Sequence, residues 1–265
     1  MTASAPVPLL PAPGTRTEQG VLERGLAALQ FVAERGEVTA TGLVQGLQLG
    51  RSSAYRLLDR LRSSGYLQES SVPGVFRLGP RVLPIGLAAL NQLDIMDIAP
   101  AHLMALAKAA GETVNLAVPL NDEMIYVYQA EGPGGVKVTA HLGTRRPLNC
   151  SSLGKAYLAA LSREELDERL PQLTAVALTV NSVVDIAALR TELDATRARR
   201  YSIDAEEVEA GVSCVGAAIR DSTGRPVAAI SVAGPAERMP GKHETVVPLV
   251  LEAAEQISRR MGCRT

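Results

Sequence analysis

The sequence predicts an α+β protein: a small winged helix-turn-helix head, a linker helix, and a larger body built over one antiparallel sheet. Two short amphipathic helices joined by a glycine-containing turn occupy residues 39–62 and predict the helix-turn-helix. Strand-like segments alternate with helical ones from Thr113 onward and predict the body. Residues 18–82 hold eight arginines and six acidic residues, whereas the whole chain has 27 basic and 28 acidic residues. A mildly basic head on an acidic body is typical of a small nucleic-acid-binding domain fused to another domain.

The head begins with a predicted helix over residues 21–34, closed by a glycine. Its expected apolar face consists of Leu22, Leu26, Leu29 and Ala33. In the helix-turn-helix, Gly50 supplies the turn. The second helix then repeats apolar residues at the spacing of one buried face, namely Ala54, Leu57, Leu58 and Leu61. A hairpin predicted over residues 67–78 would form the wing.

The opposite face of that second helix carries side chains that bind DNA phosphates and base edges. The residues expected to contact DNA are Arg51, Ser52, Ser53, Tyr55, Arg56, Arg60 and, on the wing, Arg77. Arg51 and Arg77 would bind phosphate, and the others would position or read the DNA. Two alternatives stay open: an ordinary helical hairpin with solvated arginines, and Arg77 as a simple surface charge.

A Gly-Pro pair at residues 79–80 marks the end of the head, which we place at residues 18–80. Residues 81–95 are predicted to form a linker helix, followed by a second helix over residues 98–110. The aliphatic faces of both helices suit packing between protomers, and packing within the chain accounts for them equally well. Residues 1–17, rich in Pro and Ala, are expected to be a disordered tail and not a signal peptide.

The remaining residues, 96–265, are expected to form the body. Its predicted strands are 113–118, 123–129, 136–141, 212–219 and 226–232. Its predicted helices begin at Ser151, Ser162 and Asp185, with a last helix over 244–260. The pattern Ser162-x-x-Glu165 indicates a capping box.

Three places in the body could hold a ligand. A helix that starts at Ser151, Ser152 and Leu153 offers free backbone N–H groups to an anion. Cys214 lies on a predicted strand, and Asp204 begins an acidic run. Each could equally have a purely structural role: serines that cap a helix, a small buried thiol, and solvated carboxylates.

The sequence predicts no metal site, no cofactor and no catalytic centre. Its three histidines lack metal-ligand spacing, and it contains no GxGxxG, GxxxxGK[ST] or GxSxG motif. The three cysteines are far apart and odd in number, which suits a reducing cytosol. No apolar run approaches the roughly 18 residues of a membrane span. We therefore expect a cytoplasmic protein that does not contact a membrane.

Taken together, the chain resembles the IclR family of bacterial transcriptional regulators from about Glu18 to Met261. The matching segments are 22–26, 47–58, 65–79, 111–118, 153–156, 203–207 and 228–235. The resemblance implies an N-terminal winged helix-turn-helix and a C-terminal GAF-like effector domain. It also implies binding to palindromic double-stranded operators as a homodimer or homotetramer, and a response to small organic acids.

The same resemblance implies which residues contact the effector: the backbone N–H groups of Ser152 and Leu153 and the side chains of Asp204, Cys214 and Ser231. Ser231 comes from the resemblance alone. The chain departs from the family at Ala233, where relatives often carry a second ligand-binding serine. It departs again at Asn149 and Cys150, which replace a frequent His-Ala pair. Both departures favour an effector other than the best-known ones of the family.

We therefore expect a sequence-specific transcriptional regulator, a repressor, that controls genes of carbon-source catabolism. Its operator binding would be modulated by a small organic acid whose carboxylate sits at the start of the Ser152 helix. Two alternatives remain. One is a GAF-like thiol enzyme that uses Cys214 as a nucleophile and has a low thiol pKa. The other is a DNA-binding oligomer without an effector.

Overall fold

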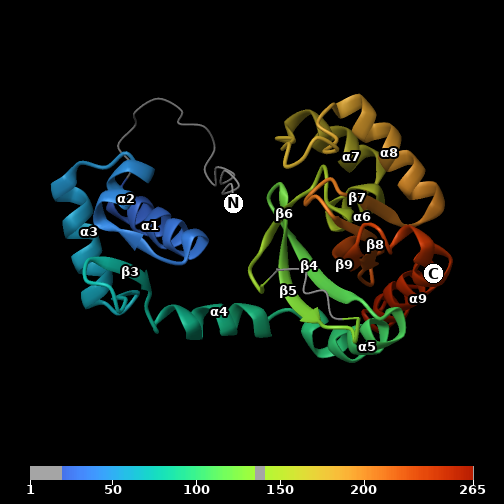
Figure 1. Cartoon of the computed structure of the whole chain (residues 1–265), viewed down its shortest axis with the longest axis horizontal. Coiled ribbons are helices and arrows are strands. Elements are labelled where there is room, and N and C mark those ends of the chain that lie inside the picture. The colour runs from blue at the N-terminus through green and yellow to red at the C-terminus, as the bar shows by residue number, and fades with distance from the viewer. Residues whose placement is uncertain (1–19, 135–140, 265) are drawn as a thin grey trace. The chain divides into compact units, whose positions relative to one another are not determined.

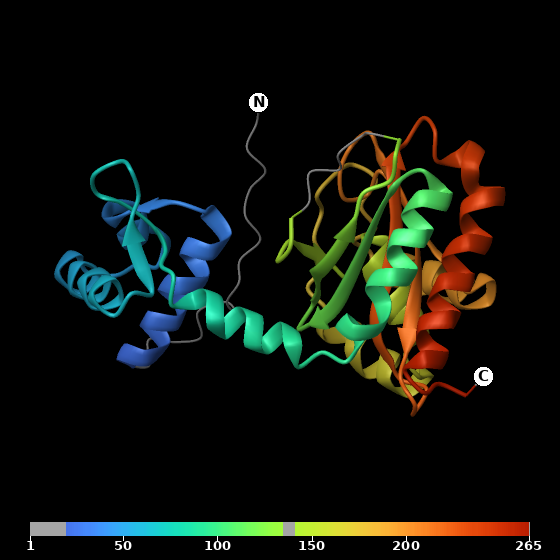
Figure 2. The same ribbon diagram turned by 90° about the horizontal axis from the view of Figure 1, so that it is seen from below.

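The computed structural model describes residues 20–134 and 141–264. The expected tail over residues 1–17 lies outside the described residues, and so does the expected strand over 136–141 apart from its last residue. Contacts divide the chain after Gln92. The expected linker helix thus groups with the head, so from here on the head means residues 20–92 and the body means residues 93–264, and each is described by itself (Figures 1 and 2).

The head contains the predicted helix-turn-helix and wing. Its elements in order are α1 (Val21–Arg35), β1 (Val38–Thr39), α2 (Ala40–Gly46), α3 (Arg51–Ser63), β2 (Leu67–Glu69), β3 (Val75–Leu78) and α4 (Val82–Asn91). The sequence did not predict β1, because two residues are too short to show an alternating pattern. This strand exists through its antiparallel pairing with β3, which gives a three-stranded sheet in the order β1-β3-β2.

The apolar face predicted for α1 is wrong. Leu22 and Leu26 are 73% and 53% exposed. The residues that α1 buries are Ala28, Phe31 and Val32, while Leu29 is partly buried and Ala33 is exposed. A Cβ at Gly46 of α2 would lie 2.1 Å from the ring of Phe31. Apolar residues lie on more than one side of α1, and the fit of this large ring against a glycine determines which side faces inward.

The prediction for α3 is confirmed, because Ala54, Leu57 and Leu58 are buried and Leu61 packs against them. By contrast, α4 buries none of its residues. Its aliphatic side chains are mostly exposed, with Leu83 64% exposed. Within the described residues no single helix is long and apolar enough to cross a membrane. Only α4 together with the helix that follows it reaches that length and composition, across a break.

The body is one antiparallel sheet with helices, as predicted. Its elements are α5 (Ile95–Ala110), β4 (Thr113–Leu120), β5 (Glu123–Ala130), β6 (Arg145–Pro147), α6 (Ser152–Ala160), α7 (Arg163–Arg169), α8 (Ile186–Arg199), β7 (Ser202–Ala205), β8 (Val212–Arg220), β9 (Pro226–Pro235) and α9 (His243–Arg260), with short 3-10 turns at Leu170–Gln172 and Pro240–Lys242. The six strands lie in the order β6-β5-β4-β9-β8-β7. The two short outer strands, β6 and β7, were not predicted. The capping box that begins α7 is confirmed.

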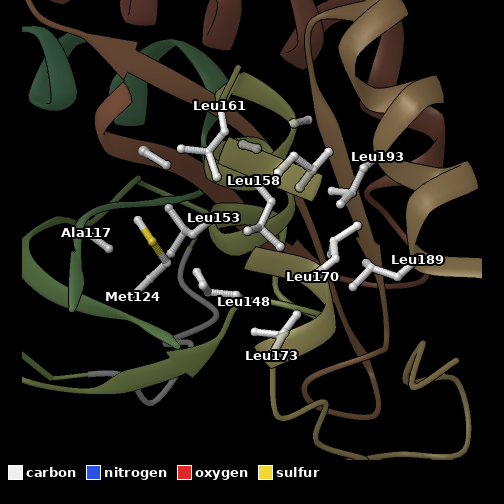
Figure 3. Packing of buried hydrophobic residues seen from close by; sticks show 14 of the residues in the cluster. Ala117, Met124, Leu148, Leu153, Leu158, Leu161, Leu170, Leu173, Leu189 and Leu193 are labelled. Atoms are coloured by element: carbon white, nitrogen blue, oxygen red, sulfur yellow. The ribbon is translucent and has the colours of Figure 1, made fainter. Parts of the chain in front are cut away.

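Helices cover both faces of this sheet (Figures 1 and 2). α5 and α9 pack side by side on one face, and α6 lies on the other face with α8 outside it. β9 is therefore buried on both sides along almost its whole length. Leu153 and Leu158 of α6 lie between Met124 of the sheet and the leucines of α8 (Figure 3). This core fixes α6 against the sheet, with its first turn beside β7 and β8.

Candidate nucleic-acid interface and ligand pocket

α3 presents the side chains assigned to DNA on its solvent side. Arg51, Ser52, Tyr55, Arg56 and Arg60 are exposed, and Ser53 is half-buried. The buried face of α3 is held by the head core, so these side chains project from a fixed helix. A fixed helix with polar groups along one outer face can enter the major groove of DNA.

The charges on α3 are not all equivalent. Arg62 is ion-paired with Asp59 at 3.1 Å, and its other nitrogen lies 4.0 Å from Glu69. Among the described residues, no carboxylate lies within 4.0 Å of Arg51, Arg56 or Arg60. The guanidinium groups of these three arginines are therefore available to phosphates or base edges.

The wing is a tight hairpin between β2 and β3. Gly74 adopts a positive φ of 76° in the connecting turn, and its N–H donates to the Glu69 carboxylate at 2.6 Å. Arg77 lies on β3 opposite Gln68 and is exposed. The structure thus places Arg77 on the surface of the wing, a position that suits a phosphate contact and a simple surface charge alike.

A small cavity of about 20 Å³ opens in the body between the start of α6, the β7–β8 hairpin and the β5–β6 hairpin. It is lined by Tyr126, Arg146, Ser151, Ser152, Leu153, Asp204, Val208, Glu209, Val212, Cys214 and Ala233. Four of the predicted effector contacts, Ser152, Leu153, Asp204 and Cys214, are thus brought together. Ser231 is buried on β9 opposite Gly216 and is not among the lining residues.

The start of α6 forms one wall of the cavity. Ser151 caps the helix: its hydroxyl accepts the N–H of Gly154 at 3.0 Å and donates to the carbonyl of Pro147 at 2.6 Å. The N–H groups of Ser152 and Leu153 precede the first helical hydrogen bond and have no acceptor among the described residues. Together with the helix dipole, two free N–H groups favour an anion at this wall.

Gly154 lets this first turn approach the preceding segment. A Cβ at Gly154 would lie 2.4 Å from the Cα of Leu148. On the other side, the carbonyl of Ser152 accepts the hydroxyl of Ser202 on β7 at 2.6 Å. The start of α6 is therefore held on both sides, and its free N–H groups keep a fixed direction.

Asp204 forms the wall opposite. Its Oδ1 accepts the N–H groups of Glu207 at 2.7 Å and Val208 at 3.4 Å. Burial raises the pKa of the Asp204 carboxyl to about 7, although these backbone hydrogen bonds act in the other direction. Near neutral pH this carboxyl can therefore either donate or accept a hydrogen bond to a ligand.

Cys214 pairs with Asp204 in the β7–β8 register and also lines the cavity. Burial, and then the charge of Asp204, raise the pKa of its thiol well above the ordinary value. A thiol that stays protonated is a poor nucleophile. The raised thiol pKa therefore argues against Cys214 as a nucleophile.

Two family models match the chain. The model of the bacterial transcriptional regulator IclR C-terminal domain matches residues 87–259. The model of the IclR helix-turn-helix domain matches residues 21–71. The chain belongs to the IclR family of bacterial transcriptional regulators. As in solved IclR structures, a helix-turn-helix head precedes a C-terminal domain with an antiparallel sheet.

Relatives of this IclR protein include transcriptional repressors. It is 34% identical to the HTH-type transcriptional repressor AllR of Klebsiella pneumoniae over 254 residues, which cover 95% of this chain and 93% of that protein. It is 33% identical to AllR of Escherichia coli K12 over 92% of this chain and 90% of that protein.

Solved structures of the IclR family resemble it closely. The IclR of Thermotoga maritima matches with a TM-score of 0.71 and 30% identity, over 91% of this chain and 98% of that chain. An IclR homologue of Microbacterium hydrocarbonoxydans, solved in complex with 4-hydroxybenzoate, matches with a TM-score of 0.77 and 25% identity, over 91% and 99%.

Behind the cavity of this IclR protein lies a buried ion pair between Lys155 of α6 and Glu207. The backbone carbonyl of Glu207 also accepts the hydroxyls of Thr179 at 3.2 Å and Ser182 at 2.6 Å. The turn after β7, which carries Val208 and Glu209 into the cavity, is therefore anchored at several points.

The two sequence departures lie in different surroundings. Ala233 lines the cavity. Asn149 is fully buried outside it, where its amide donates to the carbonyls of Val176 at 3.0 Å and Val183 at 2.8 Å. Cys150 is buried as well, and burial raises its pKa to about 12. Of these departures, only Ala233 touches the space a ligand would fill.

Sequence reasoning missed five of the lining residues: Tyr126, Arg146, Val208, Glu209 and Val212. Tyr126 and Arg146 come from the β5–β6 hairpin, and β6 has too few residues to be recognised. The available signal was the pair of adjacent arginines shortly before the Ser151 helix start.

Proposed function

We propose that this protein is a transcriptional repressor that binds a palindromic operator through α3 and the wing. A small organic acid in the body cavity would change its affinity for the operator, either releasing the DNA or tightening the binding. The observation that carries the proposal is the pair of free N–H groups at Ser152 and Leu153, which line one cavity with Asp204 and Cys214. The same chain bears exposed arginines on α3. The repressor role is supported by the AllR relatives.

In this proposal Arg56, Arg60, Ser52, Ser53 and Tyr55 position or read the DNA. Arg51 and Arg77 bind backbone phosphates. The effector carboxylate binds the start of α6, and a polar substituent meets Asp204 and Cys214, with Ser231 behind them. Genes of carbon-source catabolism are the expected targets, because the ligand is a small acid. Such a regulator acts in the bacterial cytoplasm, where the operator is.

A palindromic operator needs two heads related by symmetry. The exposed side chains of Leu83, Ile85 and Leu87 on α4, and of Leu22 and Leu26 on α1, are unpartnered within the described head. A second copy of the chain that covers these side chains would supply the second head. We therefore propose a homodimer or a homotetramer.

For the effector to change DNA binding, its affinity for the DNA-bound form of the protein must differ from its affinity for the free form. An effector that binds equally well to the DNA-bound and free forms would not change operator occupancy. Thermal unfolding with a panel of small acids tests for the effector. A ligand at about 100 times its Kd adds roughly 2.7 kcal/mol to the free energy of unfolding. If no acid in the panel stabilises the protein or alters operator binding, the protein is an effector-free DNA-binding oligomer.

The DNA surface is tested with the Arg56→Ala variant on an operator obtained by selection from random DNA. We expect operator binding to weaken by about 1–3 kcal/mol if Arg56 contacts a base, measured by fluorescence anisotropy. Arg62→Ala is the matched control, because it removes the same charge from α3 at a side chain already paired with Asp59. Equal losses for the two variants would show that only total charge matters.

A further inference from the structure

Arg146 is a cavity residue outside the predicted set of effector contacts. It lies on β6 opposite Met124 and is half-buried. Its guanidinium carbon is 5.7 Å from the centre of the Tyr126 ring. Both side chains line the cavity, on the wall formed by the β5–β6 hairpin.

The charge of Arg146 is not matched within the described chain. No Asp or Glu of residues 20–134 and 141–264 lies within 4.0 Å of it. Asp204 directs Oδ1 to backbone N–H groups instead. The neighbouring Arg145 differs, because it is ion-paired with Glu123 at 2.5 Å. A half-buried guanidinium with no carboxylate within ion-pair distance can bind one from a ligand, and arginine binds carboxylates through two parallel hydrogen bonds.

Tyr126 supplies a second donor at the same wall. It is 6% exposed, and burial raises the pKa of its phenol to about 12, with Arg146 acting in the other direction. The phenol therefore stays protonated at neutral pH. A neutral hydroxyl beside a guanidinium can donate to one carboxylate oxygen while the guanidinium binds the other.

The cavity thus has anion-binding groups on two different elements. One set is the N–H groups of Ser152 and Leu153 at the start of α6, and the other is Arg146 with Tyr126. Asp204 and Cys214 line the same cavity and suit a neutral polar substituent. The cavity, lined also by Val208 and Val212, has a volume of about 20 Å³, little more than one water needs, so a bound diacid has to be short.

We propose that Arg146 and Tyr126 form a second anion subsite, and that the effector is a short dicarboxylate with one carboxylate at the start of α6 and the other on Arg146. This inference rests on the proposed function, because it assumes the first subsite. It adds the chemical class of the ligand, which the first subsite alone does not determine.

The test compares diacids with matched monoacids. Isothermal titration calorimetry of the full chain would use malonate and succinate, and then monomethyl malonate and monomethyl succinate, which keep nearly the same shape but lose one charge. We expect at least one diacid to bind about ten- to hundredfold more tightly than its monoester, the range of one charge-assisted bidentate contact. This comparison needs no variant, so it holds whatever substitutions do to folding.

Three variants locate the effect. Arg146→Met should remove the preference for the diacid, leaving the monoester affinity within about threefold of wild type, and Arg146→Lys should keep part of the preference. Arg145→Met is the control, because it removes the same charge one residue away and should leave the preference intact. Far-UV circular dichroism confirms that each variant is folded.

The outcomes separate the two proposals. Equal affinity for diacid and monoester overturns the second subsite but leaves an organic-acid effector in place. The second subsite is also overturned if Arg146→Met lowers the affinities for the diacid and for the monoester by the same factor. In that case Arg146 and the start of α6 would both bind the same carboxylate. If none of these acids, nor any monoacid in a wider panel, binds or alters operator binding, both the effector and its second subsite are refuted.

Discussion

Replacing Asp204 with Asn should make the body more stable, and increasingly so as the pH rises. The unfolded chain releases the Asp204 proton near the ordinary pKa of 3.8, whereas the folded protein holds it up to about 7. Between these values the native state binds more protons than the unfolded state. The contribution of Asp204 to the free energy of unfolding of the wild type therefore falls as the pH rises from about 4 to about 7, and the fall stops above that range.

The magnitude follows from the same two pKa values. At 1.36 kcal/mol for each pKa unit, the difference between 3.8 and about 7 is worth about 4 kcal/mol at pH 8. An asparagine at this position stays neutral, and its oxygen can still accept the N–H groups of Glu207 and Val208. The difference in the free energy of unfolding, variant minus wild type, should grow by about 3 kcal/mol between pH 4.5 and pH 8.

Urea unfolding at several pH values measures this difference. Far-UV circular dichroism is the appropriate signal, because the chain contains no tryptophan. Asp194→Asn, which removes an exposed carboxylate from α8, is the control for net charge. A difference between Asp204→Asn and wild type that stays constant over this range would refute the reasoning, and so would a variant that loses stability at high pH.

Further expectations concern α6, the thiol and the DNA surface. Gly154→Ala should lower the free energy of unfolding by about 1–3 kcal/mol, since the added Cβ would lie 2.4 Å from the Cα of Leu148. Gly241→Ala is the control in the same urea titration, because no atom lies within 4 Å of the Cβ it adds. Cys214 should react with iodoacetamide at pH 8 more slowly than the similarly half-buried Cys263, because burial raises the pKa of the Cys214 thiol well above the ordinary value; faster labelling of Cys214 in peptide mass spectrometry would revive the thiol enzyme. Arg56→Ala should weaken operator binding more than Arg62→Ala, and an operator affinity that Arg56→Ala leaves unchanged would remove Arg56 from the DNA surface.

The sequence predicted those parts of the molecule whose signal is local. α3 was recognised because Ala54, Leu57 and Leu58 repeat along one helix, and the Ser162 capping box because its two partners are three residues apart. The face of α1 was mispredicted because it depends on the packing of Phe31 against Gly46, two residues from different helices. β1, β6 and β7 were missed because each has four residues or fewer; the equally short wing strands β2 and β3 were recognised through the Pro73-Gly74 turn between them.

The cavity shows the same division between local and long-range information. The start of α6 was visible in the sequence as consecutive serines, and Asp204 and Cys214 were ligand candidates from the residues themselves before the resemblance to the IclR family implied the same contacts. That these two lie side by side follows from the β7–β8 register. Arg146 and Tyr126 could not be placed without the β5–β6 pairing, which brings a three-residue strand beside the sheet. Sequence spacing alone therefore identified one wall of the cavity and not the wall across from it.

The anchoring of the turn after β7 affects how ligand preference can change during evolution. Asp204 binds the backbone of this turn through one carboxylate oxygen, Oδ1, and Lys155, Thr179 and Ser182 secure Glu207 from behind. Val208 and Glu209 lie on this anchored turn, Val212 begins β8, and all three line the cavity. Under the proposed function, mutations at these three positions can change the lining of the cavity while the anchors of the turn are kept, so related regulators can acquire new effectors without rebuilding the scaffold.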